Sequence, residues 1–121
     1  MTNPINWPEL LERVEDDMEL LDDLIEIFYE ETPKILDDIQ KAYEIDDYRN
    51  MGEFAHSLKG IALGFSAPIL GFNSFVIERS SNEEEYSKDK AREDIEYLLK
   101  SYEEVKEALN NKNRALKSIA S

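Results

Sequence analysis

Apolar residues recur at spacings of three, four and seven along nearly the whole chain, and this periodicity limits the fold more than any other feature. No segment alternates with a period of two, and only four glycines and four prolines interrupt the 121 residues. Amphipathic helices of this kind bury their apolar stripes against one another. The pattern therefore predicts an all-α fold, an antiparallel four-helix bundle with a short N-terminal capping helix.

Capping residues and helix breakers predict where the first two helices begin and end. Asn6, followed by a proline in the first turn, predicts a short helix at about residues 7–14. One of the two aspartates at 16–17 can cap a long second helix that ends at 44–47. Pro33 lacks an amide donor, so it should kink that helix about one turn upstream or break it.

The second half of the chain is expected to hold three more helices. They are a third helix at about 48–63, a fourth at about 68–80 and, after a loop at 81–87, a last helix that includes the C-terminal segment 111–121 as its end or as a frayed tail. Gly64 can supply a left-handed turn after the third helix. Ser66 with Pro68 can open the fourth helix.

Composition narrows the classes of protein to which the chain can belong. The formal net charge of −14 argues against binding to nucleic acid or to an anionic membrane surface, because both carry negative phosphates. Half of the acidic residues, 14 of 28, fall between Glu15 and Asp47. They form either a solvated helix face or a surface that steers a basic partner. The absence of cysteine excludes disulfides and thiolate chemistry.

Length and hydropathy favour a single domain over residues 1–121, which we expect to be soluble and cytoplasmic. No apolar run approaches the roughly 20 residues of a membrane span. No signal-peptide pattern precedes Trp7. One bundle should use up the apolar helix faces, which predicts a monomer unless an exposed Leu63 marks a contact between two copies.

His56 is the only histidine in the chain, and helical geometry places it on the outside of the third helix. At about 100° per residue, Leu58 lies near the centre of the apolar arc, and His56 projects about 160° away from it. A side chain in that position faces solvent instead of the core. His56 is therefore available to another molecule.

The residues next to His56 on the outer face suit an anionic group and a docking protein. Gly60 lies one turn further on, where glycine costs a helix roughly 1 kcal/mol relative to alanine but lets another surface approach the imidazole. Lys59 lies within reach of a phosphoryl group on the ring, whose charge an ammonium would help to hold. Leu63, two turns on, is an apolar residue on a polar face. Taken singly, each is also explained as an ordinary surface residue.

The segment Ala55–Gly60, Ala-His-Ser-Leu-Lys-Gly, resembles the motif Ala-His-x-Leu-Lys-Gly of histidine-containing phosphotransfer (HPt) domains at every defined position. The resemblance extends to Ile5-Asn6-Trp7 with Leu10-Leu11 and to 17–28 with Glu31-Thr32-Pro33, and it covers roughly residues 5–110. It implies a domain that accepts a phosphoryl group from the aspartyl phosphate of one receiver domain and passes it to the aspartate of another.

The resemblance also implies a role for each residue of the site. His56 would be the phospho-acceptor through Nε2, Lys59 would steady the phosphoryl group, and Gly60 would give clearance for the receiver. Leu63 and Ser57 would contact that partner. The partners would be receiver domains of a hybrid histidine kinase and of response regulators. The receiver would supply Mg²⁺ and most catalytic groups, so the chain itself, with no cofactor or metal of its own, would be a phosphocarrier and not an enzyme.

Family members further carry a Gln or Glu 22 residues after the histidine, and here that position is Glu78. A hydrogen bond from Nδ1–H to this residue would fix the tautomer and leave Nε2 as the nucleophile. Alternatively, Glu78 pairs with Arg79 or a lysine, or is solvated. The chain has Ile61-Ala62 where Ser or Ala is usual, and Ser66 where a glycine is usual. These departures predict a shifted turn after the third helix and leave the offset to Glu78 open.

Other functions remain compatible with the sequence. The chain could be the phospho-accepting segment of a chemotaxis-type kinase, although Met1 and the lack of a linker favour a free-standing protein. It could instead be an acidic interaction module whose histidine is incidental. A hydrolase or a metal protein is disfavoured, because one histidine and no cysteine leave only carboxylates for chemistry.

Overall fold

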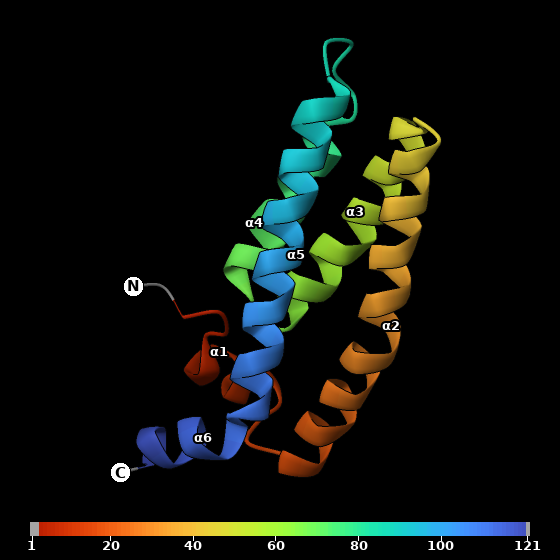
Figure 1. Ribbon diagram of the computed structural model, residues 1–121. Helices are drawn as coiled ribbons and strands as arrows, with labels where there is room; N and C mark the ends of the chain where they lie inside the picture. Colours follow the sequence, from red (N-terminus) through yellow and green to blue (C-terminus); the bar gives the residue numbers. More distant parts are fainter. Residues whose placement is uncertain (1–2, 121) are drawn as a thin grey trace.

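The computed structural model describes residues 3–120, whose helices form an up-and-down bundle (Figure 1). The four long helices are α2 (Met18–Glu44), α3 (Tyr48–Gly64), α4 (Pro68–Ser80) and α5 (Lys88–Asn110). Each runs antiparallel to the one before it, and both α2 and α4 contact α3 and α5. The four helices thus enclose one core, which confirms the predicted all-α four-helix bundle.

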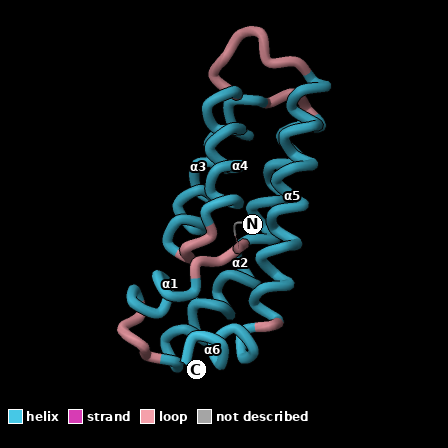
Figure 2. Tube along the Cα trace, turned by 90° about the vertical axis from the view of Figure 1, so that its left-hand side faces the viewer, coloured by secondary structure: helices cyan, strands magenta, loops and turns pink. Residues whose placement is uncertain are grey.

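Two short helices, α1 (Trp7–Arg13) and α6 (Lys112–Ala120), pack together at one end of the bundle (Figures 1 and 2). The expectation that the last long helix would include the C-terminal segment is wrong. That helix ends at Asn110, and the chain turns at Asn111 into α6. The turn lets Ala115 and Leu116 of α6 pack against the core. If α5 continued straight, these two side chains would point into solvent.

Local hydrogen bonds set the starts of most helices. The side chains of Asn6, Asp17, Asp47 and Ser87 each accept a hydrogen bond from the backbone amide three residues further on. All four caps lie where the sequence predicts a helix start. The second helix continues through Pro33 without a break.

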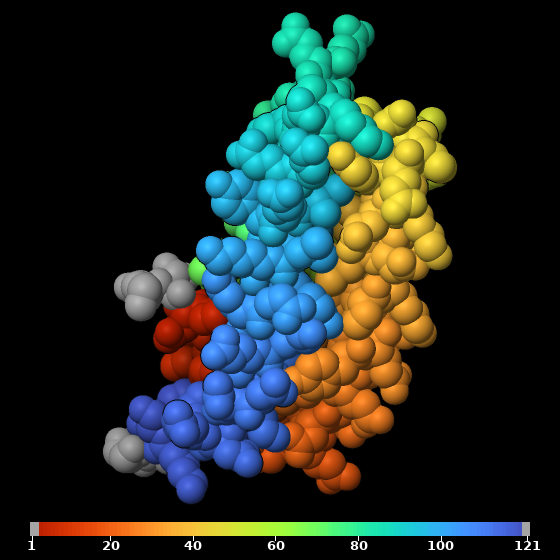
Figure 3. Space-filling view, in the orientation of Figure 1, coloured from red at the N-terminus to blue at the C-terminus, as the bar shows by residue number. Residues whose placement is uncertain are grey.

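The core is centred on large side chains from several helices. The Phe28 ring of α2 is almost fully buried, with its centroid 5.1 Å from that of Phe65 and 5.9 Å from that of Tyr102. The predicted apolar arc of α3 is confirmed. Phe54 is half-buried, and the other members, with the capping residue Phe65 that follows the helix, are buried: Met51, Ala55, Leu58 and Ala62. Figure 3 shows α2 and α5 side by side across one face of the bundle, so α3 and α4 form the other side.

The left-handed turn after α3 is at Ser66 and not at Gly64. Gly64 is the last residue of α3 and keeps a negative φ, whereas Ser66 has a φ of 55°. Its N–H and the next amide donate back to carbonyls of α3, as in a Schellman cap. Tertiary contacts hold Ser66 there: Asn6 N–H donates to its carbonyl at 2.7 Å, and its Oγ donates to Glu9 Oε1 at 3.0 Å.

Because Ser66 takes the left-handed position itself, the turn keeps its place, and the predicted shift is wrong. Ser66 does not open the fourth helix either, since Ala67 is the N-cap residue of α4 and makes no side-chain capping bond. The length of chain between the third and fourth helices is therefore the one that the usual glycine would give. This preserves the spacing between His56 and Glu78.

We expect Ser66→Gly to be more stable than Ser66→Ala by about 1 kcal/mol. Both variants lose the bond to Glu9, but only alanine keeps a Cβ in the left-handed conformation. The comparison therefore isolates the backbone strain. Urea unfolding of the two variants measures it, and equal midpoints would show that residue 66 is not strained.

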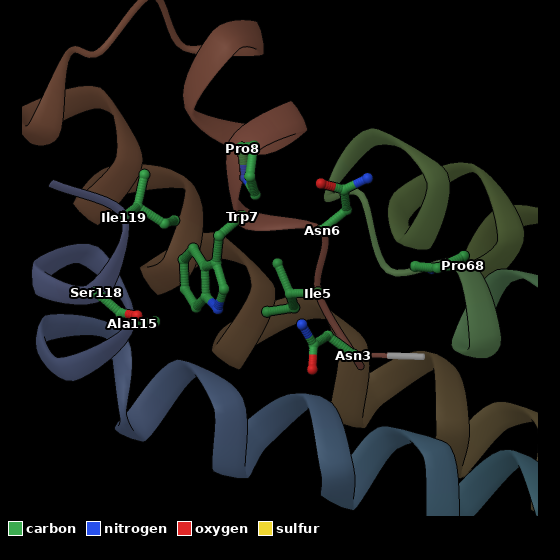
Figure 4. Close-up of a pocket in the computed structure, with 9 residues that line it drawn as sticks. All are labelled: Asn3, Ile5, Asn6, Trp7, Pro8, Pro68, Ala115, Ser118 and Ile119. Carbon is green, nitrogen blue, oxygen red and sulfur yellow. The ribbon is translucent and has the colours of Figure 1, made fainter. Parts of the chain in front are cut away.

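A pocket of about 550 Å³ lies between the N-terminal segment, α1, the start of α4 and α6 (Figure 4). The indole of Trp7 and the side chain of Ile5 face it from one side, and Ala115 faces it from α6. None of its lining residues belongs to α3. This pocket is therefore separate from the surface that carries His56.

Candidate functional site

His56 lies midway along α3 with 65% of its side chain exposed, as the helical projection predicts. Its Nδ1 is 2.6 Å from Glu78 Oε2. An ionised carboxylate only accepts hydrogen bonds, so this contact assigns the ring proton to Nδ1. Nε2 has no hydrogen-bond partner among residues 3–120, and it is the nitrogen left with an available lone pair.

Close packing of α3 against α4 brings His56 and Glu78 together. Gly52, one turn before His56, is buried, and a Cβ atom there would overlap Ser81 Oγ and lie 2.9 Å from Ser81 Cβ. The end of α4 is fixed as well, because Ser81 Oγ and Asn82 Nδ2 donate to the carbonyl of Glu78 at 2.8 and 3.1 Å. The backbone of Glu78 is therefore held where its side chain reaches the ring.

Glu78 also binds Lys59, so one carboxylate joins two residues of α3. Lys59 Nζ lies 2.7 Å from Glu78 Oε1 and 5.4 Å from the ring centroid of Phe75, and only 24% of its side chain is exposed. The ammonium of Lys59 is the main cause of a lowered pKa of Glu78, and the hydrogen bond to His56 adds to it, against a raising effect of partial burial. Glu78 therefore pairs with His56 and Lys59 and makes no ion pair with Arg79.

The remaining predicted site residues lie on the flanks of this cluster. Gly60 is exposed, and a Cβ atom there would have no neighbour within 4 Å, so packing does not require a glycine. Leu63 is 49% exposed and rests against Gly71 of α4, where an added Cβ would lie 2.9 Å from Leu63 Cδ2. Ser57 is exposed, and its Oγ donates to the carbonyl of Glu53 at 3.4 Å.

Sequence reasoning missed two residues that position the cluster, Gly52 and Phe75. Gly52 could have been found by the argument applied to Gly60, because a glycine inside a helix costs stability unless packing or function requires it. Phe75 lies three residues before Glu78 and hence on the same face of α4. Its contact with Lys59 depends on how α3 and α4 pack against each other, and no local sequence pattern predicts that packing.

A shallow depression of about 250 Å³ surrounds the exposed side of His56 and Glu78. Arg49 and Glu53 line it from α3, and Ser81 and Asn82 line it from the end of α4. Glu53 stands three residues before His56, but no group of three or more possible metal ligands occurs among the described residues. The site combines an exposed imidazole with a fixed tautomer, a nearby ammonium and an open approach.

The chain matches the family model of the Hpt domain over residues 23–111. The chain belongs to the Hpt domain family. No curated protein and no solved structure matches the chain. Hpt domains are histidine phosphocarriers of two-component systems that interact with receiver domains, and this chain is an Hpt domain of that general kind. Among residues 3–120, no helix is long and apolar enough to cross a membrane.

Proposed function

We propose that His56 is the phospho-acceptor of this Hpt domain. Its Nε2 accepts a phosphoryl group from the aspartyl phosphate of one receiver domain and donates it to the aspartate of another. The observation that carries this proposal is the bond from Nδ1 to Glu78, which leaves Nε2 unpaired on a ring that is 65% exposed. A nucleophile needs an accessible lone pair, and the fixed tautomer supplies it.

The neighbouring residues have supporting roles in the proposed transfer. Lys59 steadies the phosphoryl group with its positive charge, and Glu78 orients the ring. Gly60 gives clearance for the receiver, because nothing in the fold fills the space beside it. Leu63 and Ser57 are exposed on the same helix and contact that partner. The partners are receiver domains of a hybrid histidine kinase and of response regulators, which bring Mg²⁺ and most catalytic groups.

Intact-mass measurement after treatment with phosphoramidate, a small donor that phosphorylates histidine, tests the proposal. The wild type should gain one phosphoryl group that acid removes, because a phosphohistidine is acid-labile. His56→Gln should gain none. This substitution changes an exposed residue, so circular dichroism should show an unchanged fold. A phosphoryl gain in the variant, or none in a folded wild type, would contradict the proposal.

Partner binding and the choice of phosphoryl donor separate the alternatives. An interaction module with an incidental histidine would bind partners equally well with and without His56 and would not relay phosphate. A kinase segment would accept phosphate from a kinase domain using ATP, whereas a relay carrier accepts it from a phosphorylated receiver. Incubation with each donor distinguishes these two sources.

A further inference from the structure

Arg49 of α3 lines the same depression as His56 and exposes its positive charge to solvent. Its side chain is 89% exposed, and its Nε lies 3.9 Å from Glu53 Oε1, which is beyond hydrogen-bond distance. Among residues 3–120 the guanidinium makes no hydrogen bond. The five N–H donors of this arginine are therefore available at the depression.

The other donors near the imidazole are already engaged by Glu78. Lys59 Nζ lies 2.7 Å from its Oε1, on the other side of the ring from the arginine along α3. Ser81 Oγ and Asn82 Nδ2, which line the depression, both donate to its backbone carbonyl. Within the described part of the chain, the arginine is thus the one cation that lines this depression, and its donors are unengaged.

Helical geometry places Arg49 within reach of a group bound to His56 Nε2. The two residues are seven positions apart, so they lie two turns and about 10 Å apart along the axis and within about 20° of the same face. Side chains of a helix lean toward its N-terminus, and the imidazole therefore stands over the turn that separates it from the arginine. The depression of about 250 Å³ lies beside both side chains and leaves room for an anionic group.

The proposed transfer brings such a group to this place. The lone pair of Nε2 forms the N–P bond, and the electron pair of the O–P bond that breaks stays on the receiver aspartate. The phosphoryl oxygens carry negative charge throughout, up to two charges when the group is on the ring. A guanidinium matches two of these oxygens with two parallel N–H bonds, which an ammonium cannot form.

We propose that Arg49 binds the phosphoryl group on His56 Nε2 and donates hydrogen bonds to its oxygens. The inference rests on the proposed function and adds a phosphoryl-binding residue to the site. Arg49 transfers no proton in this role. Glu53 competes for the same guanidinium and keeps it beside the depression until the phosphoryl group displaces the weak contact.

The test follows phosphorylation of the full chain by phosphoramidate at constant ionic strength. In this reaction the P–N bond of the donor breaks and ammonia leaves. Arg49→Gln should react about tenfold more slowly, because the loss of one charge-assisted hydrogen bond has an effect of this size on a rate. Arg49→Lys should recover part of the loss, since it keeps the charge without the two parallel bonds. Both variants should fold normally, because the side chain is exposed.

Three further variants separate a direct contact from a general effect of charge. Glu53→Gln should raise the rate by about threefold, because it removes the competing carboxylate. The double variant Arg49→Gln/Glu53→Gln has the net charge of the wild type and should still react several times more slowly. Arg92→Gln is the matched control and should react like the wild type, because Arg92 pairs with Asp89 on α5, across the bundle from α3.

Nitrogen-15 NMR reports the contact itself. The Nε–H signal of Arg49 should move when the wild type is phosphorylated, whereas that of Arg92 should stay in place. An unmoved Arg49 signal in the phosphorylated wild type would overturn the inference.

Equal rates for Arg49→Gln and the wild type would overturn the inference while leaving His56 as the acceptor. A wild-type rate in the double variant, or an equal loss in Arg92→Gln, would also overturn it, because net charge alone would then explain the effect. Failure of the wild type to gain a phosphoryl group would instead overturn the proposed function, and this inference with it. The phosphorylation level of the wild type therefore separates the two failures.

Discussion

Gly60→Leu is expected to accept phosphoryl groups from a receiver domain roughly a hundredfold more slowly while folding at least as stably as the wild type. Leucine is a better helix former than glycine by about 1 kcal/mol, and no atom lies within 4 Å of the added Cβ. The side chain would, however, stand one turn from His56 on the surface that the receiver must approach. A displacement of about 1 Å between reacting atoms can lower a rate about a hundredfold.

Comparing two phosphoryl donors, a receiver domain and phosphoramidate, distinguishes a blocked approach of the receiver from a loss of reactivity of His56. Phosphoramidate is small enough to reach Nε2 past a leucine, so its rate with Gly60→Leu should remain close to that of the wild type. Gly64→Leu is the matched control, because a Cβ at that position also meets nothing within 4 Å, one turn further from His56. Equal losses with both donors, or equal losses at both positions, would contradict the role of Gly60.

Most of the fold follows from local signals in the sequence. Asn6, Asp17 and Asp47 begin helices because each side chain caps an amide three residues on, and such bonds involve only neighbours in the chain. The exposure of His56 follows in the same way from the angle between it and Leu58. These features depend on helical geometry, which the apolar periodicity already predicts.

The turn at Ser66 and the break at Asn111 depend on contacts that local patterns do not contain. A glycine pattern favours Gly64 for the left-handed residue, but hydrogen bonds from Asn6 and to Glu9 hold Ser66 there. Both partners lie near the N-terminus, far from Ser66 in the sequence. No glycine or proline marks Asn111 as the end of a helix. The break there lets the apolar side chains of α6 pack against the core beside α1.

The candidate site also combines features that local patterns predict with features that depend on tertiary packing. Its residues on α3 share one helix face, so their relation to His56 could be predicted. The partner of Glu78 could not, because an arginine neighbour and two residues of another helix compete for one carboxylate. The close approach of α3 and α4 decides the outcome, and with it the position of Lys59.

That close approach makes Gly52 a position where an added side chain should be costly to stability. We expect Gly52→Val to lower the free energy of unfolding by roughly 3 kcal/mol, at the upper end of the cost of overfilling a packed interface. The new Cβ would overlap Ser81 Oγ and lie 2.9 Å from Ser81 Cβ, and the branched carbons would add to the clash. The melting temperature should fall by about 10 °C.

Gly60→Val is the matched control, because it makes the same change in the same helix where space is open. Its stability should differ from that of the wild type by only a few tenths of a kcal/mol. Adding Ser81→Gly to Gly52→Val removes both clashing atoms and should restore part of the loss. Equal stability of the Gly52 and Gly60 variants would contradict tight packing at Gly52. Separation of the helices in Gly52→Val should also lengthen the contact between His56 and Glu78. We therefore expect NMR to detect a hydrogen-bonded Nδ1 proton in the wild type and not in this variant.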